Sequence, residues 1–342
     1  MAGRVCVIVN PAAGRGRGAR TLPAVRAAFA AVGVGDVRTT KAREDERAVA
    51  RRAIDEGFTT LVAVGGDGTW GNVANAIIAS GADCRLALIA AGTGNDFAKT
   101  VGAPMRDIPL TARLAVEASD VRVDAGRIED QYFLNIAGFG FDIAVLEDVA
   151  RVRFLRGNAL YLYSALRQLV GYAGADIAIA SAAGRRAATR HLILVIANAK
   201  NFGGAFKIAP GASLSDGKLD AISIHDAPAL RRLSLLAAAV GGTHTNKPGV
   251  VVEQAPSFTL SFAAPPAYET DGEYRQAKSA ELEVSCVPGA LRVVVPVRPD
   301  SLSPGAQGTV WATTSGYPSA CWGSGVSAGR VVGVRRIWWC LS

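Results

Sequence analysis

Apolar and polar residues follow two alternating patterns along residues 1–100. Short runs of β-branched and aliphatic residues predict buried strands, and longer stretches with apolar residues every three or four positions predict helices. The predicted strands are residues 5–9, 37–40, 61–64 and 86–89, and the predicted helices are residues 20–32, 44–56 and 72–80. Strands that alternate with helices favour parallel pairing through right-handed crossovers. The pattern therefore predicts an α/β fold with a doubly wound, mostly parallel sheet, whose ligands bind at the carboxyl ends of the strands.

The pattern changes after about residue 120, where strand-like runs follow one another with only turns between most of them. These runs are residues 121–128, 132–137, 176–180, 192–197, 219–224, 257–262, 281–286 and 291–295. Helical spacing interrupts them at residues 159–172 and 230–240. Short strands separated by turns are typical of an antiparallel β-sandwich.

We therefore expect two domains followed by a tail. Residues 1–118 would form the α/β domain and residues 119–298 a mainly antiparallel β-sandwich domain, with a short helix at their boundary. Residues 299–342 would be a poorly specified tail, because the chain from residue 301 onward has no acidic residue and little apolar periodicity. The length of 342 residues agrees with more than one domain.

Composition excludes several classes of protein. Half of the residues are hydrophobic and 19% are charged, which excludes wholesale disorder. The five cysteines are scattered and form no C-x-x-C pair, which favours a reducing, cytoplasmic compartment. No apolar stretch approaches the roughly 20 residues of a membrane-spanning helix, and the first residues lack a signal-peptide pattern. We expect no transmembrane segment.

The net charge of +8 is compatible with nucleic acid, an anionic membrane surface or a phosphorylated ligand. Many of the arginines are scattered singly along predicted helices, and no basic run is interleaved with aromatic residues. This distribution disfavours a nucleic-acid partner.

Three glycine-rich turns follow predicted strands of the first domain. They are Asn10-Pro-Ala-Ala-Gly-Arg-Gly-Arg-Gly18, Gly65-Gly-Asp-Gly-Thr69 and Gly92-Thr-Gly-Asn-Asp-Phe97. The first matches neither the P-loop nor the Rossmann fingerprint, and each turn alone is compatible with an ordinary strand-to-helix turn. Glycines let backbone amides approach a phosphate, Asp67 can hold a metal or orient water, and Thr69 can hydrogen-bond an oxygen. Two such turns at one edge of a sheet favour a nucleotide triphosphate site.

The second and third turns together resemble the catalytic domain of the diacylglycerol kinase family, which bacterial lipid kinases and sphingosine kinases share. The similarity to NAD kinases is more distant. The resemblance covers roughly residues 3–298. Downstream motifs support it and favour lipid kinases over NAD kinases: Gly138-Phe-Gly-Phe-Asp142, Gly203-Gly-Ala-Phe-Lys-Ile-Ala-Pro210, Asp216-Gly-Lys-Leu-Asp220 and Asp271-Gly-Glu273.

The resemblance implies an ATP site and two magnesium sites. ATP would lie against the three turns and the end of the second strand, at Asn10, Pro11, Gly14, Thr40, Gly65, Gly66, Asp67, Gly68, Thr69, Thr93, Asn95 and Asp96. Asp67, Asp96 and Asp124 would help hold the catalytic Mg²⁺, partly through water. A second, structural Mg²⁺ would use the Asp216 carboxylate and carbonyl groups near Ser213 and Lys218.

The resemblance also implies that the Asp271-Gly-Glu273 turn of the second domain reaches the reaction in an interdomain cleft. A lipid hydroxyl that attacks the γ-phosphate of ATP needs a carboxylate near its proton and neutralisation of the phosphate charge. We expect Glu273 to be the base, with Asp271 as the alternative and Asp67 as a further catalytic acid. Without the upstream turns, residues 271–273 would be interpreted as an ordinary acidic β-turn.

The chain departs from the family pattern at two places. After Gly65-Gly-Asp-Gly-Thr69 the family often continues with Asn-Glu, where this chain has Gly71 and Asn72. The proline that usually precedes the third turn is replaced by alanine, at Ala90 or Ala91. The missing glutamate predicts a weaker contact to metal-bound water.

These observations predict a cytoplasmic, ATP- and Mg²⁺-dependent lipid kinase of phospholipid metabolism, bound peripherally at the inner membrane surface. Its acceptor would be a hydroxyl of diacylglycerol or of a sphingoid-like lipid. Two alternatives stay open, namely an NAD kinase-like phosphotransferase and a catalytically silent nucleotide-binding regulatory protein. The sequence identifies neither the lipid nor the oligomeric state, although it is compatible with a homodimer.

Overall fold

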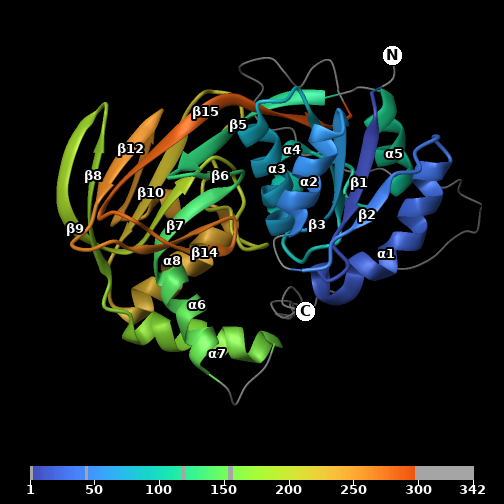
Figure 1. Cartoon of the computed structure of the whole chain (residues 1–342). Coiled ribbons are helices and arrows are strands. Elements are labelled where there is room, and N and C mark those ends of the chain that lie inside the picture. The colour runs from blue at the N-terminus through green and yellow to red at the C-terminus, as the bar shows by residue number, and fades with distance from the viewer. Residues whose placement is uncertain (1–2, 43–44, 118–119, 153–156, 297–342) are drawn as a thin grey trace, which may run out of the picture. The chain divides into compact units, whose positions relative to one another are not determined.

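The computed structural model describes residues 3–42, 45–117, 120–152 and 157–296 (Figure 1). The described residues belong to one compact unit. The tail that we predicted at residues 299–342 lies outside the described residues, and so does the expected domain boundary at residues 118–119.

The first part of the chain forms a parallel sheet connected by helices. Its strands are β1 (Val5–Val9), β2 (Val37–Thr39), β3 (Thr60–Gly65) and β4 (Arg85–Ala90), and its helices are α1 (Ala13–Ala30), α2 (Asp45–Asp55), α3 (Asp67–Ser80), α4 (Asp96–Val101) and α5 (Ile108–Glu117). The strands pair in parallel in the order β4-β3-β1-β2. This arrangement confirms the predicted α/β fold.

Helices cover both faces of this sheet because successive strand residues point in opposite directions. Cys6 and Ile8 of β1 belong to a core cluster with α2 and α3, whereas Val7 belongs to a second cluster with α1 and α5. Both faces of β1 and β3 are therefore buried, which explains why these strands are continuous apolar runs in the sequence.

The rest of the described chain is an antiparallel β-sandwich, as predicted. Its strands are β5 (Asp120–Ile128), β6 (Gln131–Phe133), β7 (Ile136–Gly140), β8 (Ala175–Ser181), β9 (Gly184–Ala197), β10 (Leu219–His225), β11 (Val250–Ala255), β12 (Ser257–Ser261), β13 (Ala267–Thr270), β14 (Glu273–Gln276) and β15 (Glu281–Val294). Its helices are α6 (Phe141–Arg151), α7 (Gly157–Gly171) and α8 (Ala229–Gly241), with a 3-10 turn at His244–Asn246. The helix α6 and the strands β11, β13 and β14 were not predicted from the sequence.

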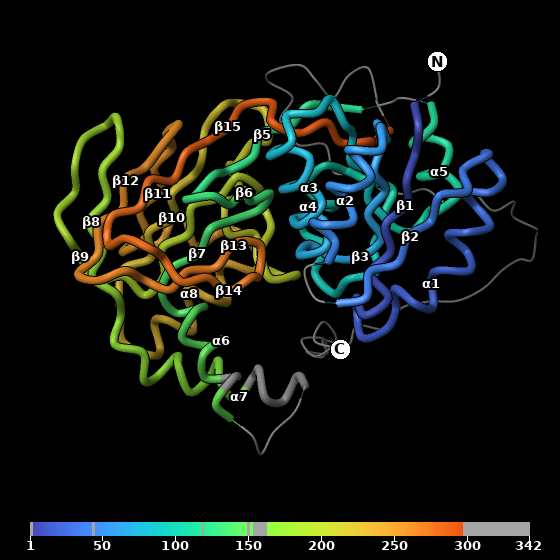
Figure 2. Tube along the Cα trace, in the orientation of Figure 1, coloured from blue at the N-terminus to red at the C-terminus, as the bar shows by residue number. Residues whose placement is uncertain are grey.

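Strand β15 joins the two parts (Figure 2). It pairs antiparallel with β12 and β5, and its last residues pair in parallel with β4 at Arg292 and Val293. The prediction of two separate strands at 281–286 and 291–295 is wrong, because one strand runs through both with a register shift between Val287 and Leu291.

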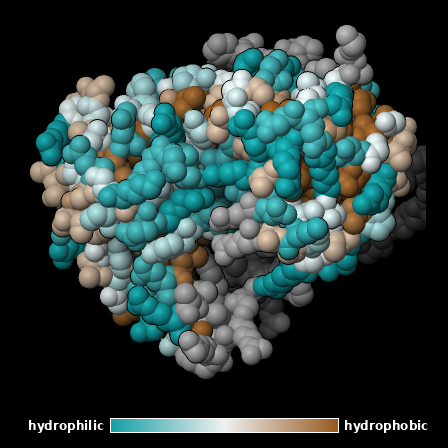
Figure 3. All heavy atoms as spheres, in the orientation of Figure 1, coloured by the Kyte–Doolittle hydropathy of each residue, from teal (hydrophilic) through white to brown (hydrophobic). Residues whose placement is uncertain are grey.

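Hydrophilic and apolar side chains gather on different regions of the surface. Hydrophilic residues dominate the face drawn in Figure 3. Exposed large apolar side chains gather on α7 and α8, where Leu166, Val170, Leu230 and Leu233 are each more than half exposed. Within the described ranges, no helix is both long enough and apolar enough to cross a membrane.

Candidate functional site

The acids of the second and third glycine turns each begin a helix at the same edge of the parallel sheet. Strand β3 ends at Gly65 and α3 begins at Asp67, while β4 ends at Ala90 and α4 begins at Asp96. Because β3 and β4 are neighbouring parallel strands, the two helix N-termini lie at the same sheet edge. A helix N-terminus attracts negative charge, so this edge suits both the carboxylates and a phosphate.

Glycines allow the three turns to pack against one another. A β-carbon on Gly66 would lie 2.9 Å from the Cα atom of Gly92, and a β-carbon on Gly92 would collide with Gly66. Gly14 has a φ of 55°, and a β-carbon there would collide with the carbonyl oxygen of Ala91. We expected these glycines to admit a phosphate. The structure adds a second reason for them, which is the close approach of one backbone to another.

A cavity of about 230 Å³ opens beside the turns. Its wall consists of Asn10, Ala13, Gly14, Glu46, Gly66, Gly68, Thr69, Asn72, Gly92 and Glu273. The wall includes the predicted ATP residues Asn10, Gly14, Gly66, Gly68 and Thr69, together with the predicted base Glu273. The remaining predicted ATP residues are outside the wall: Pro11, Thr40, Gly65, Asp67, Thr93, Asn95 and Asp96. Of these, Thr40 is buried beside the end of β1.

One side of this cavity is held together by a small polar network. The side-chain amide of Asn10 donates to the hydroxyl of Thr69 at 3.0 Å and to Oε1 of Glu46 at 2.8 Å. The network ties the first turn, the second turn and α2 to one another. Asn10 and Thr69 were predicted to contact ATP, whereas Glu46 was not predicted at all.

Asp67 faces the junction between the second and third turns. Its Oδ1 atom accepts hydrogen bonds from the backbone N–H of Phe97 at 3.0 Å and from the side-chain amide of Asn135 at 3.4 Å. Burial raises the pKa of Asp67, and the neighbouring charge of Asp96 adds to this rise. The Oδ2 atoms of Asp67 and Asp96 lie 3.2 Å and 3.3 Å from the β-carbon position of Gly94, so the two carboxylates approach the same point.

Asp96 links α4 to the Gly203-Gly204 motif of the second part. Its Oδ1 accepts a hydrogen bond from the ammonium group of Lys99 at 2.9 Å, and its Oδ2 accepts one from the backbone N–H of Gly204 at 2.7 Å. Lys99 also donates to the carbonyl oxygen of Gly204 at 2.8 Å. Both oxygens of Asp96 therefore have donors, and the sequence motif around Gly203 contacts the edge of the sheet at which the glycine turns lie.

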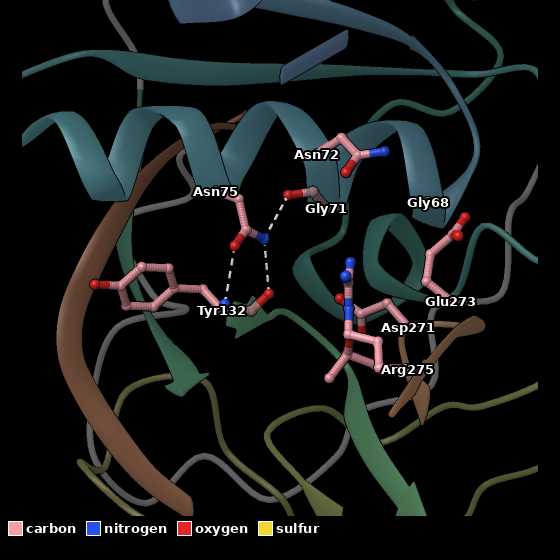
Figure 4. Close-up of a pocket in the computed structure, with 9 residues that line it drawn as sticks. Gly68, Gly71, Asn72, Asn75, Tyr132, Asp271, Glu273 and Arg275 are labelled. Carbon is pink, nitrogen blue, oxygen red and sulfur yellow. Dashed lines mark hydrogen bonds between the residues drawn. The ribbon is translucent and has the colours of Figure 1, made fainter. Parts of the chain in front are cut away.

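The Asp271-Gly-Glu273 turn connects β13 and β14, and Asp271 anchors it (Figure 4). Asp271 has a φ of 51°, in the left-handed region. Its carboxylate accepts three backbone N–H groups, from Leu134 at 2.7 Å, Asn135 at 2.8 Å and Ile136 at 3.1 Å. Burial raises the pKa of Asp271 to about 7, while the three N–H donors act in the opposite direction.

Glu273 is the acid of this turn that reaches the cavity. Its Oε1 atom lies 3.0 Å from the β-carbon position of Gly68, in the second glycine turn. Figure 4 shows its side chain extending toward Gly68 at the start of α3. Glu273 lines the 230 Å³ cavity, and Asp271 does not.

Asp124 of β5 is bonded to the loop of residues 213–219. Its Oδ1 accepts a hydrogen bond from the N–H of Gly289 and its Oδ2 from the N–H of Gly217, both at 2.8 Å. Its own N–H donates to the carbonyl oxygen of Leu214. Asp124 therefore holds the loop of residues 213–219 against β5 and β15.

The same loop contains the residues predicted for a structural Mg²⁺. The exposed carboxylate of Asp216 accepts hydrogen bonds at 3.1 Å from the N–H of Lys218 and from the side-chain amide of Gln254. Ser213 accepts a longer hydrogen bond of 3.4 Å from the N–H of Ser215. The structure thus brings Ser213, Asp216 and Lys218 into one tight loop, next to Asp124.

The resemblance implied that Asp67, Asp96 and Asp124 help hold one Mg²⁺, partly through water, and the three carboxylates differ in their direct contacts. Among the residues described by the structure, no three His, Cys, Asp or Glu side chains are grouped as ligands of one ion. Asp67 and Asp96 are neighbours, but Asp124 is bonded to the 213–219 loop instead. Two carboxylates at one point still offer oxygen ligands of the kind that Mg²⁺ prefers.

Sequence reasoning missed three residues of this site. Glu46 and Asn72 line the cavity, and Lys99 bridges Asp96 and Gly204. Glu46 stands in the first turn of a charged, amphipathic helix, where acids are common for reasons of helix stability. No local sequence signal separates it from its neighbour Asp45.

Comparisons with known proteins find matches for both parts of the chain. Residues 4–128 match the family model of the diacylglycerol kinase catalytic domain, and residues 135–295 match that of the YegS C-terminal NAD kinase beta sandwich-like domain. A probable lipid kinase YegS-like protein of Pseudomonas aeruginosa (strain UCBPP-PA14) is 31% identical over 267 residues, which cover 76% of this chain and 84% of the relative. A diacylglycerol kinase of Bacillus subtilis (strain 168) is 27% identical over 273 residues, covering 79% of this chain and 90% of the relative.

Solved structures share the fold. A diacylglycerol kinase from Bacillus anthracis str. Sterne superposes with a TM-score of 0.65 at 19% identity, covering 86% of this chain and 97% of the solved one. A further Bacillus anthracis structure reaches a TM-score of 0.70 at 21% identity, with 86% and 98% covered. With the relatives above, these matches confirm the resemblance found in the glycine turns. The chain belongs to the diacylglycerol kinase catalytic-domain family and carries a C-terminal domain of the YegS type.

Proposed function

We propose that this chain is an ATP-dependent lipid kinase that transfers the γ-phosphate to a hydroxyl of diacylglycerol or of a related, sphingoid-like lipid. The position of Glu273 carries the proposal, because its carboxylate lies against Gly68 in the wall of the same cavity as the glycine turns. Phosphoryl transfer to a hydroxyl requires a phosphate-binding wall and a carboxylate in one cavity. Relatives named diacylglycerol kinase and probable lipid kinase support the acceptor class.

The chemical step needs little from the protein beyond positioning and one proton acceptor. The lipid hydroxyl oxygen forms a bond to the γ-phosphorus as the bond from that phosphorus to the β-phosphate oxygen breaks. Glu273 accepts the hydroxyl proton, and ADP leaves with the bridging oxygen. Asp271 contributes by fixing the turn, since its carboxylate is bonded to three backbone N–H groups.

Asp67 and Asp96 are our candidates for the catalytic Mg²⁺, because their Oδ2 atoms converge beside Gly94. When bound, the ion would neutralise charge on the transferring phosphate. Lys99 and Gly204 fix the orientation of the Asp96 carboxylate. We keep Asp216, with carbonyl groups near Ser213 and Lys218, as the candidate for a separate structural ion.

The apolar side chains on α7 and α8 support work at a membrane surface. Val170 is 73% exposed and Leu230 is 86% exposed, although residues of this type are usually buried. A lipid acceptor has to be taken from a bilayer, so an exposed apolar surface on the enzyme would bring the cavity to its substrate. We therefore propose peripheral binding to the cytoplasmic face of the inner membrane.

An NAD kinase-like activity is the second candidate, because residues 135–295 match an NAD kinase beta sandwich-like domain. Its acceptor would be a ribose hydroxyl in place of a lipid hydroxyl, with the same cavity and the same base. A silent nucleotide-binding protein would keep the cavity without transfer. The three possibilities differ in the product that receives the phosphate.

The test uses the purified full chain with γ-labelled ATP, Mg²⁺ and a detergent-dispersed lipid extract, and a parallel reaction with NAD. We expect label in an organic-extractable product, and its chromatographic mobility compared with phosphatidic acid would identify the acceptor class. Label on NAD alone would overturn the lipid acceptor. Bound ATP with no labelled product in either reaction would overturn the kinase proposal. Glu283→Gln, which replaces an exposed Glu on β15, is the matched control for any Glu→Gln variant of the site that is measured in this assay.

A further inference from the structure

Glu46 is a buried acid in the wall of the nucleotide cavity for which the chemistry above has no use. It lies in the first turn of α2, and only 2% of its surface is exposed. An acidic side chain that is this buried normally has partners for both oxygens, because an unpaired buried charge is costly. The hydrogen-bond partners of its two oxygens therefore bear on which part of a ligand could lie beside Glu46.

The two carboxylate oxygens of Glu46 differ. Oε1 accepts a hydrogen bond from the amide of Asn10 at 2.8 Å and has a longer contact of 3.5 Å with the hydroxyl of Thr69. Oε2 is buried and has no hydrogen-bond partner among the residues that the structure describes. Burial raises the pKa of Glu46, and the charges that add to this rise are those of the acids Asp45 and Glu273, which supply no donor, while its own backbone N–H acts in the opposite direction. Within the described part of the chain, one acceptor of this wall residue is thus left without a hydrogen-bond donor.

The charge of Glu46 decides which part of ATP suits this position. A triphosphate would be repelled by a carboxylate, whereas the nucleoside carries hydrogen-bond donors, namely the ribose hydroxyls and the adenine amino group. An acid that binds ribose hydroxyls beside a glycine-rich turn is a recurring device in nucleotide-binding α/β folds. We propose that Glu46 Oε2 accepts a hydrogen bond from the nucleoside part of ATP and so makes Glu46 a nucleotide-specificity residue of this chain.

This inference rests on the proposed use of ATP. It assigns the nucleoside end of the cavity to the side bounded by α2, Asn10 and Thr69. The phosphates then extend toward Gly68 and Glu273, where the transfer would take place. Glu46 would then recognise the nucleoside and Glu273 would accept the proton, so two acids of the same cavity wall would have different roles.

Binding measurements on Glu46→Gln test the inference without relying on turnover. A hydrogen bond to a charged acceptor is typically worth enough that its loss weakens binding roughly tenfold to a hundredfold. We expect calorimetry to show this loss for MgATP and none for Mg-tripolyphosphate, which has no nucleoside. Glu283→Gln is the control for the substitution itself, and thermal unfolding verifies that each variant is folded.

Analogues then identify the donor. Three analogues each lack one donor: 2′-deoxy-ATP and 3′-deoxy-ATP lack a ribose hydroxyl, and ITP lacks the adenine amino group. The wild-type chain should bind either a deoxy analogue or ITP about tenfold or more weakly than it binds ATP. Glu46→Gln should bind that same analogue about as well as it binds ATP. Loss of discrimination against a deoxy analogue assigns a ribose hydroxyl, and loss against ITP assigns the amino group. Unchanged ATP affinity in a folded Glu46→Gln variant, or equal losses for ATP and tripolyphosphate, would overturn the inference. Failure of the wild-type chain to bind ATP would instead overturn the proposed function.

Discussion

Three acids outside the cavity wall and two acids in the wall differ in how their carboxylates are bonded. Outside the wall, Asp96, Asp124 and Asp271 each have donors on both carboxylate oxygens, and most of these donors are backbone N–H groups. In the wall, Glu46 has one oxygen without a donor among the described residues, and Glu273 extends toward Gly68. Only the second group lines the 230 Å³ cavity.

This contrast distinguishes acids that hold the chain in place from acids that could take part in the reaction. A carboxylate that accepts two or three backbone N–H groups is fixed in place by them. These bonds favour the ionised form, but in Asp271 burial outweighs them and raises the pKa to about 7, so its fixed position is what sets it apart. A carboxylate beside a phosphate-binding turn is placed to accept a proton from a substrate hydroxyl. The Asp271-Gly-Glu273 turn contains one acid of each kind, separated by a single glycine.

Asp67 combines a positioning role with a place at the candidate metal site, so its removal should have the largest effect. Its Oδ1 joins the turns through Phe97, and its Oδ2 approaches the same point beside Gly94 as Oδ2 of Asp96. Asp67→Ala should lower kcat by roughly a thousandfold or more, because metal-ion stabilisation of a phosphoryl transition state is worth several kcal/mol. The labelled-ATP assay measures this. A kcat within tenfold of wild type would remove Asp67 from the metal site.

Asp271→Asn should act mainly on stability, which would sharpen the contrast with Glu273. The amide NH₂ group cannot accept the backbone N–H groups that the lost oxygen accepted, and a buried unmet donor costs about 1–3 kcal/mol. We expect this loss in the urea-unfolding free energy, with normal ATP affinity in the folded fraction. Asp130→Asn is a matched control, since the Asp130 side chain is 68% exposed. Wild-type stability together with a lost kcat would instead make Asp271 the base.

The pair of Asp142 and Glu269 gives the smallest predicted effect and shows what two neighbouring buried acids do. Both oxygens of Asp142 and Oε1 of Glu269 are buried, and the two side chains lie together over Gly138. Burial raises the pKa of Glu269 well above its ordinary value of 4.5, and the charge of Asp142 adds to the rise. Between the ordinary pKa of 4.5 and the raised pKa in the folded chain, Glu269 holds a proton in the folded chain and has lost it in the unfolded chain. The folded chain therefore binds more protons in this range.

The contribution of Glu269 to the free energy of unfolding should therefore be largest below about pH 4.5. It should fall as the pH rises toward the folded-state pKa of Glu269. The slope from one proton is at most about 1.4 kcal/mol per pH unit. Glu269→Gln keeps a donor for Asp142 and removes the titration. Urea unfolding from pH 5 to pH 9 should show a smaller decline for the variant, and parallel curves would contradict a shared proton.

Much of the first part of the fold could be predicted from the sequence because its strands are buried on both faces. Strands β1, β3 and β4 are unbroken apolar runs between glycine turns, so periodicity and turn chemistry agree. Strands β13 and β14 could not be predicted, because they are four residues long and include charged residues. Helix α6 was missed because apolar Phe141, Ile143 and Val145 alternate as in a strand.

The candidate site was predictable only where residue types are unusual for their position. Glycines and acids in the turns after β3 and β4 have few structural explanations in combination, so they point to a phosphate site. Glu46 and Lys99 are ordinary helix residues in the sequence, and only the packing of α2 and α4 against the turns gives them a role. The bonding of Asp124 to Gly289 likewise depends on how β5 pairs with β15.

The most direct test of the distinction between positioning acids and reacting acids is the kcat of Glu273→Gln at saturating lipid and ATP. We predict a kcat lower by roughly 10²–10⁴-fold, the usual contribution of a general base, with ATP affinity within about threefold of wild type and unchanged stability. An unchanged kcat in this variant would contradict the assignment and return the role of base to Asp271 or to another group.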